Sequence, residues 1–298
     1  MNVIATRQLT RRYGGRTGIE AVNLDVAEGE IFGFLGPNGA GKTTTIRVLL
    51  GFLRASRGAA HILDLDCWRQ SHLIKRRVGY LPGDLRLYPW FTARRALEIV
   101  GRVRGAEILA HGRELLERFR LEENLPVRKM SRGMRQKLGI VLSLVHKPQL
   151  LVLDEPTSGL DPLMCDELYG CLKELAAAGH TVFFSSHTLS EVELLCQRVA
   201  VVREGSIVAD ESISELRKRA HRAVTLRFRD AASASQIAWP EFLDEVVQDG
   251  PLWRCDLVGS ASQLVEWAAA LPLEDLSVGP PSLEGLFRRY YRTREESS

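Results

Sequence analysis

Residues 31–43 read IFGFLGPNGAGKT, and this stretch decides the fold. Its first part, IFGFL (31–35), is a compact apolar run followed by glycine, which predicts a buried strand. After it, TTTIRVLLGFL (43–53) has the apolar face of a helix, with Gly51 near the expected end. Between them, GPNGAGKT (36–43) matches the pattern G-x-x-x-x-G-K-[ST]. A strand, a glycine-rich loop and a helix in this order predict a phosphate-binding site.

The residue types of the loop suit that chemistry. Its glycines let backbone N–H groups close around phosphate oxygens, and the helix N-terminus adds the positive end of its dipole. Lys42 supplies a positive charge to the β- and γ-phosphates, and Thr43 offers a hydroxyl to Mg²⁺. The alternative, a glycine-rich turn that only caps a helix, is less favoured in this context. The expected binding residues are Gly36, Pro37, Asn38, Gly39, Ala40, Gly41, Lys42, Thr43 and Thr44.

An acidic pair ends a second apolar run. LLVLDE (150–155) finishes in Asp154 and Glu155, and the carboxyl ends of parallel strands face the crevice in which such sheets bind ligands. Asp154 is suited to bind Mg²⁺, and Glu155 is placed to polarise an attacking water as a general base. Two solvated carboxylates at a strand end are the alternative, and the upstream loop disfavours it.

Composition excludes several classes of protein. The chain has 298 residues, a length that predicts two domains, and 45% of them are apolar and 26% charged, as is typical of globular proteins. A net charge of +3 is too small to indicate a nucleic-acid partner. The five cysteines form no CxxC pair, which disfavours a zinc or redox site. The start lacks a secretory signal and no apolar run approaches the ~20 residues of a membrane span, so any membrane role is expected through a partner.

Strand and helix patterns alternate along the first two thirds of the chain. Residues 1–30 predict short, partly antiparallel strands, and 85–146 predict long helices. Strands over 149–155 and 180–187 are followed by helices over 162–178 and 188–197. This alternation predicts an α/β fold with a parallel sheet covered on both faces.

The last part of the chain has a different pattern. After a basic helix, SISELRKRAHR (212–222), we expect a strand over 224–228, a hairpin over 245–258, a helix over 260–271, a strand over 273–278 and a closing helix over 281–291. The order indicates a small α+β domain with a ferredoxin-like sheet. The expected domains are therefore 1–220 and 221–298, and the final TREESS is expected to fray.

Four further matches make the first domain similar to a known family. MSRGMRQ (130–136) resembles the LSGGQ signature of ATP-binding cassette (ABC) ATPases, and SGLD (158–161) resembles their D-loop. His187 resembles their switch histidine, and Tyr13 resembles the aromatic that stacks on adenine. Over about 1–220 the chain therefore resembles a P-loop NTPase of the ABC type, with a parallel sheet core, an antiparallel β subdomain and a helical subdomain at about 85–146.

Each match also has a plainer structural explanation when taken alone. His187 could make an ordinary hydrogen bond at a strand end, and Tyr13 could be a packed ring. Ser131 and Asp161 could cap helices. Capping by Ser131 is compatible with function, since a hydroxyl and unpaired N–H groups at a helix start form an anion site.

The resemblance implies a mechanism and partners. Two such chains, here a homodimer, would sandwich ATP and Mg²⁺ between the loop of one chain and Ser131, Gly133 and Asp161 of the other. Hydrolysis would use Lys42, Glu155 as base and His187 to hold the γ-phosphate and water. The partner would be a separate integral-membrane permease, which alone would place this cytoplasmic chain on the inner face of the membrane, with no nucleic acid involved.

The sequence departs from the family pattern in two places. Gly83 stands where the Q-loop glutamine is usual, with Asp84 next to it, and the signature has Arg132 and Met134 where Gly and Gln are commoner. The departure at Gly83 puts the usual link between metal site and membrane partner in doubt. The departure in the signature indicates a subtype of the family, and the other motifs predict active hydrolysis. The closing PPSLEGLFRRYY (280–291) resembles the C-terminal extension of type-2 ABC exporter ATPases, although a generic dimerisation module is an alternative.

Other functions stay open in principle. A soluble ABC ATPase acting on ribosomes or nucleic acid is one alternative, although such relatives usually carry two cassettes or large inserted modules. A P-loop kinase is disfavoured by the signature and the D-loop. The transported substrate is not encoded in any motif of this chain.

Overall fold

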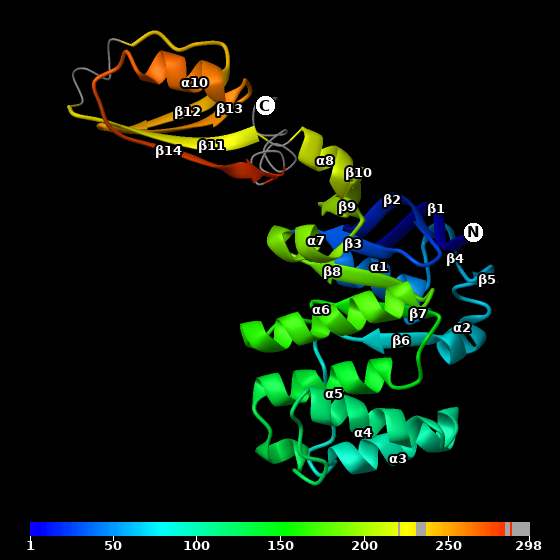
Figure 1. Cartoon of the computed structure of the whole chain (residues 1–298). Coiled ribbons are helices and arrows are strands. Elements are labelled where there is room, and N and C mark those ends of the chain that lie inside the picture. The colour runs from blue at the N-terminus through cyan, green and yellow to red at the C-terminus, as the bar shows by residue number, and fades with distance from the viewer. Residues whose placement is uncertain (220, 231–236, 284–286, 288–298) are drawn as a thin grey trace. The chain divides into compact units, whose positions relative to one another are not determined.

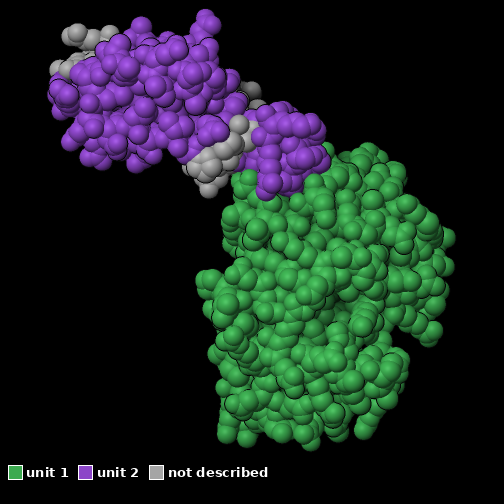
Figure 2. Space-filling model, viewed as in Figure 1, with its two compact units in different colours: residues 1–211 green, residues 212–298 purple. Residues whose placement is uncertain are grey.

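The computed structural model describes residues 1–219, 221–230, 237–283 and 287. The chain divides into two compact units, Met1–Glu211 and Ser212–Ser298, coloured separately in Figure 2. The composition change near residue 220 therefore lies inside the second unit, and a domain boundary at 220 stays a prediction. Within the described residues, no helix has both the length and the apolar character needed to cross a bilayer.

A six-stranded sheet forms the centre of the first unit, in the order β10-β9-β3-β8-β7-β6 (Figure 1). β3 pairs in parallel with β8 and β9, and β7 pairs in parallel with β6 and β8. The strands are β3 (Ile31–Leu35), β6 (Val78–Leu81), β7 (Leu150–Asp154), β8 (Thr181–Ser186), β9 (Arg198–Arg203) and β10 (Ser206–Ser212). Every residue of β3, β7 and β8 is buried, as expected for strands covered on both faces.

Helices pack on the central strands of this sheet. α6 (Pro162–Ala177) and α7 (Leu189–Leu195) contact β3 or β8, whereas α1 (Lys42–Leu49) contacts β7 and strands of a second sheet. Gly51, just beyond α1, has a φ of 66°, and Phe52 N donates to Arg47 O at 2.8 Å. The expected glycine end of this helix is therefore present.

The second sheet of unit 1 has the order β2-β1-β4-β5. Its strands are β1 (Asn2–Tyr13), β2 (Arg16–Ala27), β4 (Arg57–Ile62) and β5 (Leu65–Asp66). The predicted antiparallel pairing within 1–30 is confirmed, but the predicted short length of the strands is wrong, because β1 and β2 each run for 12 residues. Register shifts beside Gln8 (φ 51°) interrupt the alternation, which made one long strand resemble several short ones.

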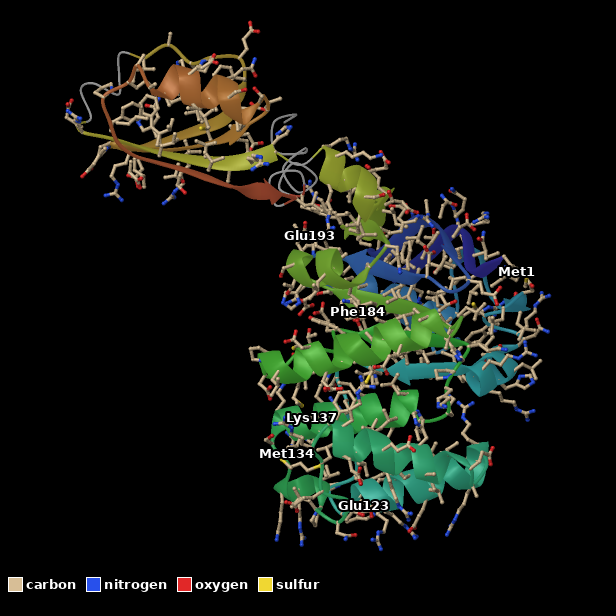
Figure 3. All side chains as sticks on the ribbon, in the orientation of Figure 1. Met1, Glu123, Met134, Lys137, Phe184 and Glu193 are labelled. Carbon is tan, nitrogen blue, oxygen red and sulfur yellow. The ribbon has the colours of Figure 1, made fainter. Side chains whose placement is uncertain are left out.

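The expected helical region contains α3 (Ala93–Arg104), α4 (Ile108–Arg118) and α5 (Arg132–Leu144), which contact one another. Thr92 caps α3 through its side chain, and Ser131 caps α5. Figure 3 labels Met134 and Lys137 on α5, and Glu123 beside α3. A shorter helix, α2 (Ser71–Arg77), precedes β6.

The second unit contains one antiparallel sheet in the order β12-β13-β11-β14. Its elements are α8 (Ile213–Lys218), β11 (His221–Phe228), β12 (Leu243–Asp249), β13 (Leu252–Leu257), α10 (Ala261–Ala268) and β14 (Leu273–Ser282). The first strand lies between the third and the fourth, which is the order of a ferredoxin-like sheet. Trp253, fully buried, packs against Phe228 and Trp239 in the core of this unit.

Two expectations for this unit need correction. The basic helix stops at Lys218 instead of 222, because His221 already pairs in β11. Pro281 and Ser282 belong to β14, so the closing helix cannot begin at 281. The rest of that helix lies outside the described residues, apart from Phe287, whose N–H donates to Leu283 O at 2.9 Å.

Candidate functional site

The phosphate-binding loop connects β3 directly to α1. Gly41, immediately before α1, has a φ of 106°, and a Cβ there would lie 2.9 Å from Gly18 O. A Cβ on Gly36 would lie 2.4 Å from Val202 O. Both positions therefore exclude other residues, Gly41 by its backbone conformation and Gly36 by contact with the backbone of the neighbouring strand β9.

A pocket of about 430 Å³ lies over this loop. Tyr13 contributes one wall, with its ring 43% exposed and the Arg11 guanidinium 4.9 Å from the ring centroid. The remaining lining residues are Arg16, Thr17, Gly18, Pro37, Asn38, Gly39, Gly41, Lys42, Thr43, Thr44 and Glu155. Most of the expected loop residues and Tyr13 therefore meet at one pocket. Gly36 and Ala40 do not line it, since Ala40 is buried and Gly36 lies against Val202.

Sequence reasoning missed the part of this pocket that comes from the start of β2. A Cβ on Gly18 would lie 2.7 Å from Tyr13 Cε2, so the absence of a side chain at 18 leaves room for the tyrosine ring. The GG turn and the glycine after Thr17 were the available signals.

Lys42, Glu155 and His187 form one charged cluster. Lys42 Nζ is almost completely buried, lies 3.0 Å from Glu155 Oε1 and donates to Gly36 O at 2.5 Å. The other carboxylate oxygen, Glu155 Oε2, lies 2.5 Å from His187 Nδ1. Glu155 has a φ of 52°, a left-handed conformation that is costly for a residue with a side chain. The strain directs its carboxylate toward Lys42 and His187, the two predicted catalytic partners.

Asp154 is held between two hydroxyls. Thr43 Oγ1 donates to Asp154 Oδ2 at 2.8 Å, and Ser185 Oγ donates to Asp154 Oδ1 at 2.7 Å. Asp154 and Ser185 are register partners in the parallel pair β7–β8. Ser185 was missed in the sequence, although the two serines that end VFFSS were a signal.

A divalent cation fits this arrangement. The Thr43 hydroxyl and the Asp154 carboxylate are adjacent oxygen donors of the kind that Mg²⁺ prefers. Among the described residues, no group of three or more His, Cys, Asp or Glu is placed to hold a metal. Mg²⁺ in such sites completes its shell with phosphate oxygens and water.

A second pocket, of about 440 Å³, adjoins the first and is called here the catalytic pocket. It is lined by Asn38, Thr43, Arg47, Tyr80, Pro82, Gly83, Asp84, Asp154, Glu155, Ser158 and His187. Gly83 faces Asp154, whose carboxylate would lie 3.5 Å from a Cβ at that position. Asp84 pairs with Arg86 at 2.9 Å and is 70% exposed, so its carboxylate is engaged with that arginine.

The signature and the D-loop lie against each other within the chain. Ser131 Oγ accepts from Met134 N at 3.1 Å, and Asp161 Oδ1 accepts from Met164 N at 3.0 Å, so both residues cap helices. Arg132 Nη2 donates to Ser158 Oγ at 2.8 Å. Ser131, Gly133 and Asp161 line neither pocket. Of the predicted nucleotide-binding residues, these three are not brought to the loop of their own chain.

Comparison with known proteins places this site in a family. A family model described as "ABC transporter" matches residues 19–158. The bacitracin transport ATP-binding protein BcrA of Bacillus licheniformis is 37% identical over 254 residues, which cover 83% of each chain. The chain belongs to the ABC transporter family. It is an ABC ATPase.

Other relatives and solved structures support the same family and fold for this ABC ATPase. The Nod factor export ATP-binding protein I of Ralstonia nicotianae is 38% identical over 219 residues, 72% of this chain and 68% of that protein. A solved ATP-binding subunit of an ABC transporter superposes with a TM-score of 0.68 at 29% identity, covering 72% of this chain and 92% of the other. A bacterial ABC transporter cassette solved as a dimer has a TM-score of 0.66 at 24% identity, over 70% and 98%, and shows the same fold. The chain thus has the fold, the nucleotide site and the ATPase activity of the family.

Proposed function

We propose that this ABC ATPase works as a dimer with a second copy of itself and powers export through a separate membrane permease. The observation that carries the proposal is the match with BcrA over 83% of both chains, second unit included in part, because that relative is named for bacitracin transport. The Nod factor relative is named for export, which supports the direction.

Nucleotide binding is assigned to the first pocket. The Tyr13 ring lies at its edge, where it stacks on adenine, and the loop from Gly36 to Thr44 surrounds the phosphates. Lys42 exchanges its contact with Glu155 for the phosphate oxygens, since a triphosphate carries more charge than one carboxylate. Thr43 and Asp154 would hold Mg²⁺, which would supply positive charge to the phosphates.

Hydrolysis is assigned to Glu155 and His187. The Glu155 carboxylate accepts a proton from a water that lies in line with the γ-phosphate. His187 Nδ1 at 2.5 Å orients the carboxylate, and the exposed His187 side chain lines the catalytic pocket, where it would contact the γ-phosphate. Ser185 fixes Asp154 and also accepts from Glu155 N at 3.2 Å, so one hydroxyl positions both acidic residues.

The dimer follows from residues that the pockets of one chain lack. Exposed Ser131 caps the start of α5, and with the half-buried Gly133 it offers a hydroxyl and N–H groups to an anion. We assign their ligand as the γ-phosphate held by the second copy, with Asp161 at the same interface. A related cassette was solved as a dimer, which supports this arrangement.

A groove in the first unit is assigned to the permease. This groove, of about 410 Å³, lies between β6, α3 and α5, and its walls are mostly apolar, including Ile99 and Val103. Lys75 and Arg104 stand among its lining residues. Apolar walls with basic side chains fit a short cytoplasmic helix that carries apolar and acidic residues. The arginine-rich segment 86–104 is an alternative docking surface for the permease, but its Arg86, Arg94 and Arg95 pair with neighbouring acids, which favours the groove.

The test is capture of the dimer and its partner. Tagged Glu155→Gln protein, incubated with ATP and Mg²⁺ and purified from detergent-solubilised membranes, is expected to co-purify with one integral-membrane protein and to run as a dimer. Glu155→Gln combined with Ser131→Arg is the control, since it blocks the anion site and should stay monomeric. Recovery on ribosomes or nucleic acid, without a membrane protein, would refute the proposal in favour of a soluble ABC ATPase.

A further inference from the structure

The catalytic pocket and the groove meet at one side chain. Of all the residues that line the two, Tyr80 alone lines both. Asp154, Arg47 and Gly83 also line the catalytic pocket, and Lys75 and Ile99 also line the groove. A displacement of this ring therefore changes the wall of both the catalytic pocket and the groove.

The strand register places the Tyr80 ring beside the metal-binding carboxylate. Tyr80 of β6 pairs with Val152 of β7, and Asp154 lies two residues further along β7 on the same face. The charge of Asp154 and, above all, burial raise the pKa of Tyr80 to about 12. The tyrosine therefore stays neutral at physiological pH and acts by its shape and position.

A stack of side chains connects the ring to the rim of the groove. The Phe52 and Tyr80 ring centroids are 5.8 Å apart, and Lys75 Nζ lies 4.4 Å from the centroid of Phe52. Phe52 follows α1, the helix that starts with Lys42 and Thr43, and its N–H is bonded to Arg47 O. A partner that contacts Lys75 would therefore shift the Phe52 and Tyr80 rings together.

The usual Q-loop glutamine, which would connect the metal site to the membrane partner, is replaced by Gly83 here. Gly83 has no side chain to extend toward Asp154, and the carboxylate of Asp84 is exposed and paired with Arg86. Tyr80, three residues before Gly83, is the aromatic residue that lines the catalytic pocket.

We propose that Tyr80 is a positioning residue that couples the occupancy of the groove to the catalytic pocket through its packed ring. The inference rests on the proposed function only in identifying the permease as the occupant of the groove. By linkage, coupling in one direction requires coupling in the other, so MgATP in the pocket must alter the groove. This reciprocal effect is measurable on the chain without its partner.

A fluorescent label on the groove provides the measurement. Val103 lines the groove and is 78% exposed, so Val103→Cys accepts an environment-sensitive thiol label. Burial raises the pKa of all the native thiols, which keeps them slow to react at neutral pH. The parent without Val103→Cys checks that selectivity. The full-length chain also carries Glu155→Gln, so that ATP stays bound.

MgATP is expected to change the emission of the labelled protein. Tyr80→Leu removes the ring and is expected to reduce that change to less than about half at saturating nucleotide. Tyr80→Phe keeps the ring and restores it. Tyr88→Leu, an exposed tyrosine that lines neither pocket, leaves it intact. Binding of a fluorescent ATP analogue and circular dichroism establish that every variant is folded and loaded.

Three results would overturn the inference: no emission change in the parent, an undiminished change in Tyr80→Leu, or an equal loss in Tyr80→Phe. None of them depends on finding the permease. Failure of the capture experiment above would instead refute the proposed function and leave the coupling measurement valid.

Discussion

Removal of the Ser185 hydroxyl tests how the buried metal-binding carboxylate is held. Ser185 and Asp154 are both almost completely buried, and Ser185 Oγ donates to Asp154 Oδ1 at 2.7 Å. Ser185→Ala leaves that oxygen without its donor. A hydrogen bond to a charged group contributes about 1.5–3 kcal/mol to stability, and the loss should approach this range because water does not readily replace the donor.

Hydrogen exchange gives the stability arm of this test. A factor of ten corresponds to about 1.4 kcal/mol, so the slowest amides of β7 and β8 are expected to exchange about 10- to 150-fold faster in Ser185→Ala. Thr6→Val is the matched control. Thr6 Oγ1 is fully buried but donates to a neutral carbonyl, Val22 O, at 2.9 Å, and its loss costs about 1 kcal/mol.

The second arm is the Mg²⁺ dependence of phosphate release. Residues that orient a metal ligand typically affect metal affinity or activity by about 10- to 100-fold, so the Mg²⁺ concentration for half-maximal hydrolysis should rise by a factor in that range. In Thr6→Val it should not change. If Ser185→Ala shows wild-type exchange and wild-type Mg²⁺ dependence, the assignment of Ser185 as the support of Asp154 is refuted.

Three further outcomes are expected. Glu155→Gln lowers the rate of phosphate release by about 10²- to 10⁴-fold while the binding of a fluorescent ATP analogue is retained, and equal loss of both would contradict its role as base. Gly41→Ala, with a φ of 106° and a Cβ 2.9 Å from Gly18 O, abolishes nucleotide binding, whereas Gly39→Ala, where a φ of 82° strains the backbone but nothing lies within 4 Å of the Cβ, weakens binding less in the same titration. Burial, assisted by the charge of Arg104, lowers the pKa of His146 from 6.5 to about 4. The unfolded chain then binds more protons between these values, so the free energy of unfolding decreases as pH falls through this window, and His146→Asn makes that decrease smaller in urea titrations.

The nucleotide site was largely readable from the sequence because its residues are adjacent in the chain. A strand, the loop GPNGAGKT and a helix are one continuous segment, and Asp154 and Glu155 end a strand of the same sheet. Parallel strands bring their carboxyl ends to one edge whatever the connections between them, so the acidic pair was expected at the loop, whereas His187 was expected there from the family resemblance. The distances of Glu155 to Lys42 and His187 bear out that juxtaposition.

Contacts between distant segments were not readable. Ser185 meets Asp154 only through the register of β7 and β8, and Gly18 leaves room for Tyr13 only through a turn between two long strands. The strands β4, β6, β9 and β10 were not predicted, because they are short or partly exposed and have no motif. In the second unit, His221 joined a strand although its basic neighbours favour a helix, since pairing with β13 and β14 outweighs local propensity.

The unusual signature is best understood as one surface with the D-loop. Arg132 replaces the commoner glycine, and its guanidinium donates to Ser158 Oγ at 2.8 Å. Beside it, a Cβ on Gly133 would lie 2.6 Å from Gly159 O, so this glycine is required by the close approach of the two segments. In the proposed dimer both segments face the second copy. Because Arg132 bonds the signature to the D-loop, the two segments should approach the nucleotide of the second copy as a unit. Arg132 then stabilises the proposed dimer interface, and its presence does not indicate a lost function.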